Sequence, residues 1–544
     1  MSGGMLGIGT SGLQAFQRAL ATTSHNISNA NTEGFSRQRV ELSARPPERA
    51  GNSFFGTGVQ VGAVTRIADQ FVESQLRTAT SGSEQYSVFH DYARRVDSLL
   101  AEADSGLSPG LQRFFGAVQD VANDPTSNPA RQALLSEAES LVDRFRFLDQ
   151  RLGEQRDLVN GQIASTVEEI NGLAEALGRV NADIVTALGR GATPNDLLDQ
   201  RDSLVRDLAE RVNLTTTEQD DGALNVFIGN GQNLVLGSRT NPLVARSLGE
   251  DPAQLDVGFG QTNTVDVSRL ITGGRLGALL EVRGSVLDVA QNSLGRTAIG
   301  LAEAFNEQHR QGQGLDGIID RNFFEVPQPQ VLPSEQGLVP PQVTISDAGV
   351  LGTGDFRLVA VDDGEGGGGL DWQLRGVPGG QLIEDPSTVG LDVDTSVIAG
   401  ASAGDSFLIR PTRTAAAQIA TEIADPRQVA AAGVEGGVGD NSNALALAQL
   451  QDATILANGT STLEGSYNTL IAEVGTRTRQ AEVASQSQAR LLEQAQAQRE
   501  SISGVNLDEE AANMLRFQQS YQAAAQVISV TNSLFDTLLS AVRR

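Results

Sequence analysis

The chain has 544 residues and a formal net charge of −27, and every one of its 40 basic residues is an arginine. Such a charge disfavours binding to nucleic-acid phosphates or to an anionic membrane, because like charges repel. The sequence contains no cysteine, which excludes disulfides, thiolate catalysis and cysteine-ligated metals. A chain of this length is expected to form roughly three or four domains with sizeable cores.

The first predicted element is a helix with an apolar seam near the N-terminus. Its largest apolar residues fall seven apart, at Leu6, Leu13, Leu20 and Ile27, with Phe16 and Thr23 at intermediate positions. This spacing is typical of a coiled coil. The opening segment has neither a basic n-region nor an apolar h-region, and no apolar run is long enough to span a bilayer. We therefore expect any export to use a route other than Sec.

An Asn- and Ser-rich run at 25–32 is predicted to end this helix, because these side chains compete for backbone hydrogen bonds. The run and its continuation contain a distinctive motif: Asn26, Ile27, Ser28, Asn29, Ala30, Asn31, Thr32, Gly34 and Phe35. The motif resembles the N-terminal signature of the flagellar rod, hook and hook-associated family, in which a heptad helix meets an Asn-rich turn, a Gly-aromatic pair and a strand. Ser28 and Phe35 stand where that family often has alanine and tyrosine.

The middle of the chain alternates between helical and β-type patterns. Residues 38–83 are rich in Pro and Gly and are expected to form an extended connector with short strands. Apolar residues at three-four spacing predict a helical bundle from 84–211, 273–327 and 413–503. Within it we expect a helix at 414–429 and an inward-facing Leu491. Short apolar runs between turn residues predict a small β excursion at 212–272 and an outer β domain at 328–412, which opens with a proline-rich linker at 328–341.

The last predicted element is a helix over 506–542 with a sustained heptad. Large side chains fall at every seventh position: Leu507, Met514, Tyr521, Ile528, Phe535 and Val542. The expected interleaved positions are Ala511, Gln518, Ala525, Asn532 and Leu539. Asn506 is predicted to cap the helix, with Glu509 reaching back to free backbone donors. The terminal seams either pack on each other within one chain or become ordered only when many subunits pack together, since a short isolated helix is marginal in water.

The segment 504–539 resembles the C-terminal ending of the same flagellar family, in its members at the hook-filament junction. The expected fold is therefore multidomain α+β. It combines a terminal α-helical coiled coil (1–37 with 504–544), a long-helix bundle core and inserted β-rich outer domains. The residues expected to carry assembly lie on the two seams: Leu13, Leu20, Ile27, Leu507, Met514, Tyr521, Ile528 and Phe535.

The resemblance implies a non-enzymatic subunit that assembles as a ring at the distal end of the hook and joins hook to filament. It implies extracellular placement after type III export without a cleaved signal peptide. The implied partners are copies of itself, the hook protein, a second junction protein and an export chaperone on the C-terminal helix. Two alternatives stay open, namely another axial protein such as a hook or rod subunit, and a secreted coiled-coil protein carrying a surface β binding module or hydrolase.

Candidate catalytic and ligand sites are weak. Two glycine triplets have the spacing of a dinucleotide-binding loop without its strand-helix context: Gly7, Gly9 and Gly12, and Gly312, Gly314 and Gly317. The three histidines lie far apart and form no metal-binding pair: His25, His90 and His309. Acidic, glycine-rich loops at 362–369 and 436–440 could hold calcium only weakly, and plain solvated turns are favoured. We therefore expect no enzyme activity, no cofactor and no metal.

Overall fold

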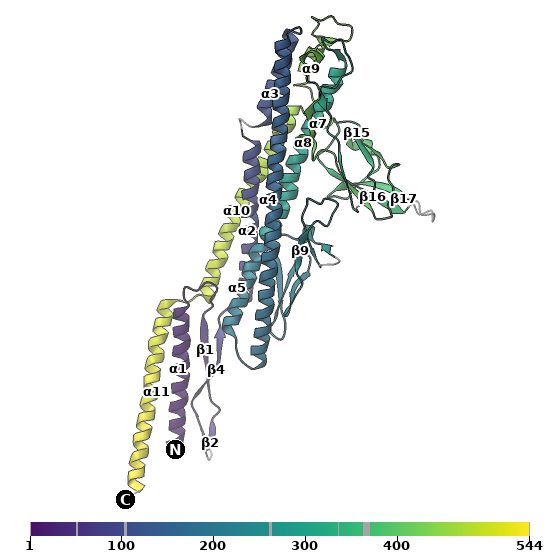
Figure 1. Cartoon of the computed structure of the whole chain (residues 1–544). Coiled ribbons are helices and arrows are strands. Elements are labelled where there is room, and N and C mark those ends of the chain that lie inside the picture. The colour runs from purple at the N-terminus through teal and green to yellow at the C-terminus, as the bar shows by residue number, and fades with distance from the viewer. Residues whose placement is uncertain are drawn as a thin grey trace.

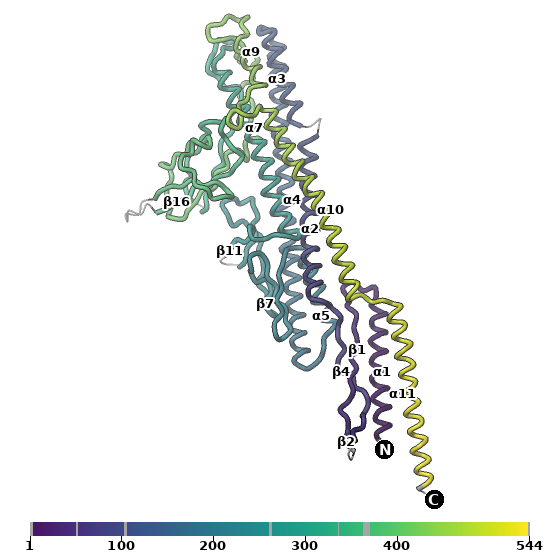
Figure 2. The backbone as a smooth tube through the Cα atoms, turned by 180° about the vertical axis from the view of Figure 1, so that it is seen from behind, coloured from purple at the N-terminus to yellow at the C-terminus, as the bar shows by residue number. Residues whose placement is uncertain are grey.

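The computed structural model describes residues 2–50, 53–102, 106–260, 264–335, 337–362 and 370–542. The molecule is elongated, with both ends of the chain at one tip, long helices along its axis and β-rich parts along one side (Figure 1). The view from behind shows the same arrangement, with the terminal helices and a hairpin at one tip and the β-rich parts along one side of the bundle (Figure 2). This arrangement confirms the expected multidomain α+β architecture. Within the described ranges, no helix is both long enough and apolar enough to cross a membrane.

The bundle is organised around α4 (Asn128–Gly189), a single helix of 62 residues. Its buried apolar residues form one continuous face from Leu134 to Ile184. The Ser127 hydroxyl caps the helix by accepting from the Ala130 N–H at 3.3 Å, and a proline occupies the first turn. Six further helices complete the bundle: α2 (Gln70–Leu100), α3 (Leu107–Asn123), α5 (Asn195–Arg211), α6 (Gly274–Val282), α7 (Asp288–Arg310) and α10 (Leu463–Ser503). A π-helical turn, η2 (Arg283–Leu287), joins α6 to α7.

The end of the bundle far from the chain termini contains an aromatic cluster. There Phe114 lies among three other fully buried phenylalanines, with ring centroids 5.2 to 6.1 Å away, and the group is Phe114, Phe305, Phe323 and Phe324. Short elements close this end: α9 (Ser442–Gln449), β12 (Gly312–Gln313) paired with β22 (Ala432–Gly433), and β13 (Phe324–Glu325) paired with β21 (Ala420–Thr421). The second glycine triplet, at 312–317, therefore lies in a strand and loop after α7.

Three local predictions in the bundle were wrong. The helix α2 begins at Gln70, well before residue 84, because Asp69 accepts hydrogen bonds from the next free backbone N–H groups. The expected helix at 414–429 shrinks to α8 (Ala415–Gln418), because the next residues form β21 and pair with β13. The 3-10 turn η4 (Pro426–Gln428) follows. Leu491 is 51% exposed, because this half of α10 packs on α2 through Leu492 and Ala495 instead.

The β-rich parts are antiparallel. A hairpin beside α1 pairs β1 (Gln38–Ala44) with β4 (Val59–Arg66), and its tip pairs β2 (Glu48–Ala50) with β3 (Ser53–Phe55). One four-stranded sheet and one three-stranded sheet then form the small β excursion: β5 (Leu214–Glu218), β6 (Leu224–Ile228), β7 (Gln232–Leu236) and β8 (Arg239–Thr240), then β9 (Leu243–Arg246), β10 (Asp256–Phe259) and β11 (Val265–Asp266). A short 3-10 turn, η1 (Ser268–Leu270), follows.

The outer β domain contains a five-stranded sheet and a separate strand pair. The sheet has the order β14 (Gln330–Pro333), β20 (Ser406–Arg410), β16 (Asp355–Asp362), β17 (Leu370–Val377) and β18 (Leu382–Ile383). The pair is β15 (Gln342–Ile345) with β19 (Leu391–Asp394), which follows the 3-10 turn η3 (Pro386–Val389). The predicted proline-rich linker thus contains a strand, β14, whose exposed edge tolerates Pro333.

Candidate assembly interface

The terminal helices α1 (Ser2–Ser28) and α11 (Leu507–Val542) lie side by side, and α1 stands between α11 and the hairpin (Figures 1 and 2). The start of α11 is capped as predicted, because the Asn506 side chain accepts from the backbone N–H groups of Asp508 at 3.0 Å and Glu509 at 3.2 Å. The predicted return contact of Glu509 is wrong. Its carboxylate instead accepts a hydrogen bond from Arg37 at 2.7 Å, across the two ends of the chain.

The residues of α11 that face α1 repeat every seven positions, as predicted. Only one of the two sets of positions in this repeat is the predicted set. Most of the less exposed residues of α11 follow one heptad: Glu510, Met514, Phe517, Tyr521, Ala524, Ile528 and Thr531. Asn513, Ser520 and the expected Ala525 beside it are also half-buried. Met514, Tyr521 and Ile528 were expected on it. The interleaved positions lie one residue earlier than predicted, and the expected Gln518 and Asn532 are exposed. Residues three and four positions after a seam residue lie on the same side of the helix. The seven-residue spacing alone therefore does not show which of them faces α1, and the position of α1 decides it.

Two glycines allow α1 and α11 to approach closely. A Cβ added to Gly9 would lie 2.8 Å from Ile528 Cγ1, and one added to Gly12 would lie 3.5 Å from Ala524 Cβ. Gly9 and Gly12 therefore belong to a helix-packing face, and the whole first triplet lies inside α1, which excludes it as a dinucleotide loop. The predicted seam residues of α1 lie beside this face and are half-buried: Leu13, Leu20 and Ile27.

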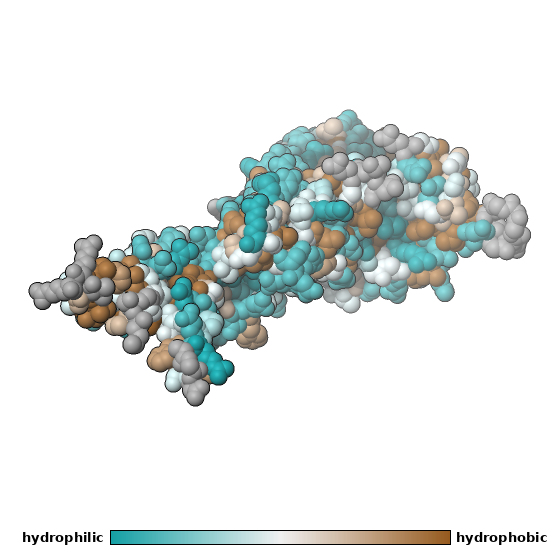
Figure 3. Space-filling view, turned by 90° about the horizontal axis from the view of Figure 1, so that it is seen from below, coloured by the Kyte–Doolittle hydropathy of each residue, from teal (hydrophilic) through white to brown (hydrophobic). Residues whose placement is uncertain are grey.

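Much of the apolar surface of α11 is not covered by α1. Leu507 and Phe535, both expected on the seam, are 53% and 51% exposed. We define the free α11 face by its exposed apolar side chains: Val530, Leu534, Phe535, Leu538 and Leu539. Seen from below, apolar side chains gather at the tip that carries the terminal helices (Figure 3). The structure thus shows the terminal seams packed on each other within one chain, with apolar surface left over.

The Asn-rich motif holds the end of α1 to the hairpin. The buried Asn26 side chain donates to the Gln38 carbonyl at 2.9 Å and accepts from the Gln38 N–H at 3.0 Å, like a strand partner. Asn29 donates to the His25 carbonyl at 3.0 Å, and the His25 and Phe35 rings meet edge to face at 5.4 Å. The remaining motif residues shape the turn, with Thr32 donating to the Asn29 side chain: Ser28, Ala30, Asn31 and Thr32.

Gly34 is required by its surroundings. Its φ is +81°, and an added Cβ would lie 2.5 Å from the Arg206 guanidinium. The Gly34 carbonyl accepts from Arg499 of α10 at 2.8 Å. Arg499 and Arg206 both pair with the buried carboxylate of Glu73, at 2.8 and 3.2 Å. We call this group, which ties α2, α5, α10 and the motif together, the basal joint.

A second ion cluster lies beside the basal joint. Asp199 of α5 accepts from the Ser36 N–H at 3.2 Å, and Arg66 pairs with Asp199 at 3.0 Å and with Asp202 at 2.6 Å. Burial raises the pKa of Asp199, although its hydrogen bonds and Arg66 oppose the shift. Burial of Arg66 lowers its pKa, but attraction to the carboxylates of Asp202 and Asp199 outweighs this and raises the pKa overall. Sequence reasoning missed these charges, because on amphipathic helices they look like a solvated face.

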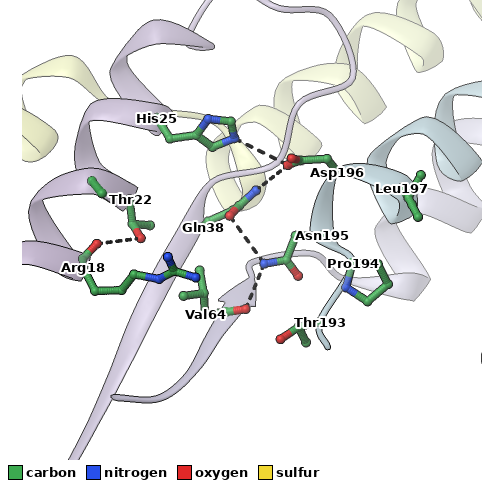
Figure 4. A pocket seen from close by; sticks show the side chains of 11 residues that line it. Arg18, Thr22, His25, Gln38, Val64, Thr193, Pro194, Asn195, Asp196 and Leu197 are labelled. Atoms are coloured by element: carbon green, nitrogen blue, oxygen red, sulfur yellow. Dashed lines mark hydrogen bonds and ion pairs between the residues drawn. The ribbon is translucent and has the colours of Figure 1, made fainter. Parts of the chain in front are cut away.

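A polar cleft separates α1 and the hairpin from the start of α5 (Figure 4). Asp196 lies 3.4 Å from His25 Nε2 and accepts from the Gln38 side chain at 2.9 Å. Asn195 donates to the Val64 carbonyl at 2.8 Å. These contacts join α1, β1, β4 and α5. Together with the basal joint, they set the angle between the terminal helices and the bundle.

Comparisons with known proteins agree with this geometry. Over 550 aligned residues, the chain is 35% identical to flagellar hook-associated protein 1 of Salmonella typhimurium, covering 97% of this chain and 98% of that protein. The Escherichia coli protein of the same name is 33% identical, with 97% and 98% covered. The chain belongs to the flagellar hook-associated protein 1 family. Both relatives cover nearly the whole chain, so the recognition made from its two ends is confirmed.

Family models and a solved structure extend the match to hook-associated protein 1. The model of the FlgK helical domain matches residues 93–324, the flagellar basal body rod FlgEFG C-terminal model matches 496–541, and the flagella basal body rod model matches 6–35. The hook junction protein FlgK of Burkholderia pseudomallei shares the fold, with a TM-score of 0.71 at 22% identity over 79% of this chain and all of that one. The two rod models fall on the terminal helices.

The candidate ligand groups serve structural roles in this hook-associated protein 1 family member. His309 is buried. Its Nδ1 donates to the Arg321 carbonyl at 2.7 Å, and its Nε2 accepts from the Ala430 N–H at 2.9 Å. Burial lowers the pKa of His309 to about 4. Asp440 caps its own loop by accepting from Gly433 and Ser442. Among the described residues, no three His, Asp or Glu side chains group as metal ligands. The other candidate loop, at 363–369, lies outside the described residues.

Proposed function

We propose that this chain is a structural subunit of the bacterial flagellum that assembles as a ring at the distal end of the hook. It joins hook to filament through packing of its terminal helices. The nearly full-length match to hook-associated protein 1 supports this role over that of a hook or rod subunit. It also disfavours a secreted effector built around a separate β module.

The observation that carries the proposal is the free α11 face. Leu534, Leu538 and Leu539 are 49%, 58% and 47% exposed on a helix whose neighbouring face already packs on α1. Fully burying one such side chain contributes about 1.5 to 3 kcal/mol. Contiguous apolar surface of this kind marks a protein interface. Because the contact is absent from the isolated chain, it stabilises the polymer by mass action.

The same surface supports the partners that the family resemblance implies. In the assembled ring, the free α11 face packs on terminal helices of neighbouring copies, with the hook protein on one side and a second junction protein on the other. Before export through the flagellar type III apparatus, a cytoplasmic chaperone covers this face, because exposed apolar helices associate non-specifically. The mature position is extracellular, at the hook-filament junction.

Deleting the gene tests the role. Electron microscopy of the deletion strain should show hooks without filaments, and flagellin should accumulate in the medium; the wild-type gene should restore filaments. Missing hooks would assign the protein to the hook or rod instead. Normal filaments in the deletion strain, with no second copy of the gene, would refute the proposal.

Charged substitutions test the interface itself. Leu534→Asp places a charge on the free α11 face without touching α1, whereas Ile528→Asp or Tyr521→Asp also breaks the packing of α11 on α1. All three should leave the bundle folded by circular dichroism but stop incorporation. Val483→Asp, at a 53% exposed position of α10, is the matched control and should assemble normally. Normal filament numbers with Leu534→Asp would contradict the proposed interface.

A further inference from the structure

The tip of the hairpin beside α1 carries two exposed phenylalanines. Phe54 and Phe55, on β3, are 70% and 59% exposed. They pair with Arg49 and Glu48 of β2, so the tip is a narrow two-stranded ribbon. A ribbon of this kind is at best marginally stable alone. Because successive side chains of a strand point to opposite faces, the two rings give each face of the ribbon a large apolar group with few rotatable bonds.

The tip is held in a defined position by the body of the hairpin. The β1 and β4 strands stay paired from Gln38 opposite Arg66 to Ala44 opposite Val59. Below the tip, the Thr57 hydroxyl donates to the Pro46 carbonyl at 2.8 Å, and the Val59 N–H donates to Ser11 of α1 at 3.3 Å. The aromatic pair is therefore presented by a strand pair anchored on α1.

The terminal region thus has two unpartnered apolar surfaces that differ in shape. The hairpin and α11 flank α1 on different sides, and the tip lies near the N-terminal end of α1 in both views (Figures 1 and 2). A twofold dimer needs one self-complementary patch, whereas two different patches on one subunit generate rings or helices of identical copies. A ribbon with two rings at its end suits insertion against a helix surface, and the free α11 face is such a surface.

We propose that the aromatic tip of one copy, Phe54 and Phe55, packs against the terminal helices of a neighbouring copy, in a head-to-tail contact repeated around the ring. This inference rests on the proposed function and names a contact within it. The tip lies at the same end of the molecule as the free α11 face but on the other side of α1, so the two surfaces can meet only between copies, and a second copy of this chain is its partner. The hook protein, or another junction protein, is the alternative that the test separates.

Cysteine cross-linking tests the contact, because the chain has no cysteine of its own. Cells would co-express a Phe54→Cys chain with a Leu534→Cys chain (α11) or an Ile8→Cys chain (α1), and assembled junctions would be oxidised. We expect disulfide-linked dimers of two differently tagged chains from at least one pairing. The control pairs Phe54→Cys with Val438→Cys, 69% exposed at the far end of the bundle, and should stay monomeric. No dimer from either pairing would overturn the inference, as would a disulfide that forms only with a cysteine introduced into the hook protein.

Filament counts give a second measurement. The double substitution Phe54→Ser with Phe55→Ser should lower the number of filaments per cell at least tenfold, while secretion of the chain into the medium is unchanged. Phe147→Ser, at a 40% exposed position on α4, is the matched control and should behave as wild type. Wild-type filament numbers with the double variant would refute the aromatic contact alone. Failure of the wild-type gene to restore filaments would refute the proposed function instead.

Discussion

The close approach of α1 to α11 at Gly9 can be tested with three glycine-to-alanine changes on one helix. Alanine is more favourable than glycine in a helix interior by about 0.8 to 1.0 kcal/mol. At Gly7 no other atom lies within 4 Å of an added Cβ, so Gly7→Ala should stabilise α1 by nearly that amount. At Gly12 the new methyl would lie 3.5 Å from Ala524 Cβ, an ordinary contact, so Gly12→Ala should also stabilise.

Gly9→Ala should behave differently. Its Cβ would lie 2.8 Å from Ile528 Cγ1, so the isoleucine must leave its rotamer or the helices must separate. Overpacking of this kind costs about 1 to 3 kcal/mol, which offsets or exceeds the propensity gain. We expect the α1–α11 pair to lose up to about 2 kcal/mol relative to wild type.

Native-state hydrogen exchange of amides in α1 and α11 measures these differences locally. Since 1.4 kcal/mol corresponds to a factor of ten, Gly7→Ala should raise protection in α1 about fourfold. Gly9→Ala should lower protection in both terminal helices without changing the bundle. Equal stabilisation by Gly7→Ala and Gly9→Ala would refute the close packing at Ile528.

Other contacts make further predictions. Asn26→Ala removes two hydrogen bonds to the buried Gln38 backbone and should destabilise the start of β1 by about 2 to 4 kcal/mol in hydrogen exchange, whereas Asn31→Ala, at an exposed position, should not. Glu73→Gln leaves two arginines of the basal joint without their carboxylate and should cost about 3 to 5 kcal/mol in urea unfolding; a loss below 1 kcal/mol would contradict the joint. His309 has a pKa lowered to about 4, so its neutral form is favoured on folding, and the stability it contributes is present above about pH 6.5 and is lost as pH falls toward 4. The fall in stability over this range should be smaller in His309→Gln, and an identical pH profile would show that the histidine titrates freely.

Many helices and strands were predictable because the spacing of apolar residues along a short segment determines them. Heptad spacing located both terminal helices, and short apolar runs between turn residues located the β-rich regions that contain β6, β16 and β20. Asn506 was recognised as a cap because its hydrogen bonds reach only two and three residues along the chain. The helix predicted over 414–429 failed at the point where tertiary pairing of β21 with β13 competes with local propensity.

The candidate interface was predictable only in part. Met514, Tyr521 and Ile528 were found from spacing, but the interleaved positions depend on which side of α11 carries α1. The basal joint could not be inferred, since Glu73 and Arg499 are 426 positions apart and each alone looks like an ordinary exposed charge.

By itself, the sequence determined the flagellar family, the terminal heptad helices and the order of helical and β-rich segments. These depend on motifs and on interactions within one or two helical turns. Only the tertiary structure decided that Glu509 pairs with Arg37, that Gly9 lies against Ile528, and that the free α11 face and the aromatic tip stay uncovered. Burial and ion pairing between distant segments depend on where the folded chain places them, and no local pattern encodes that placement.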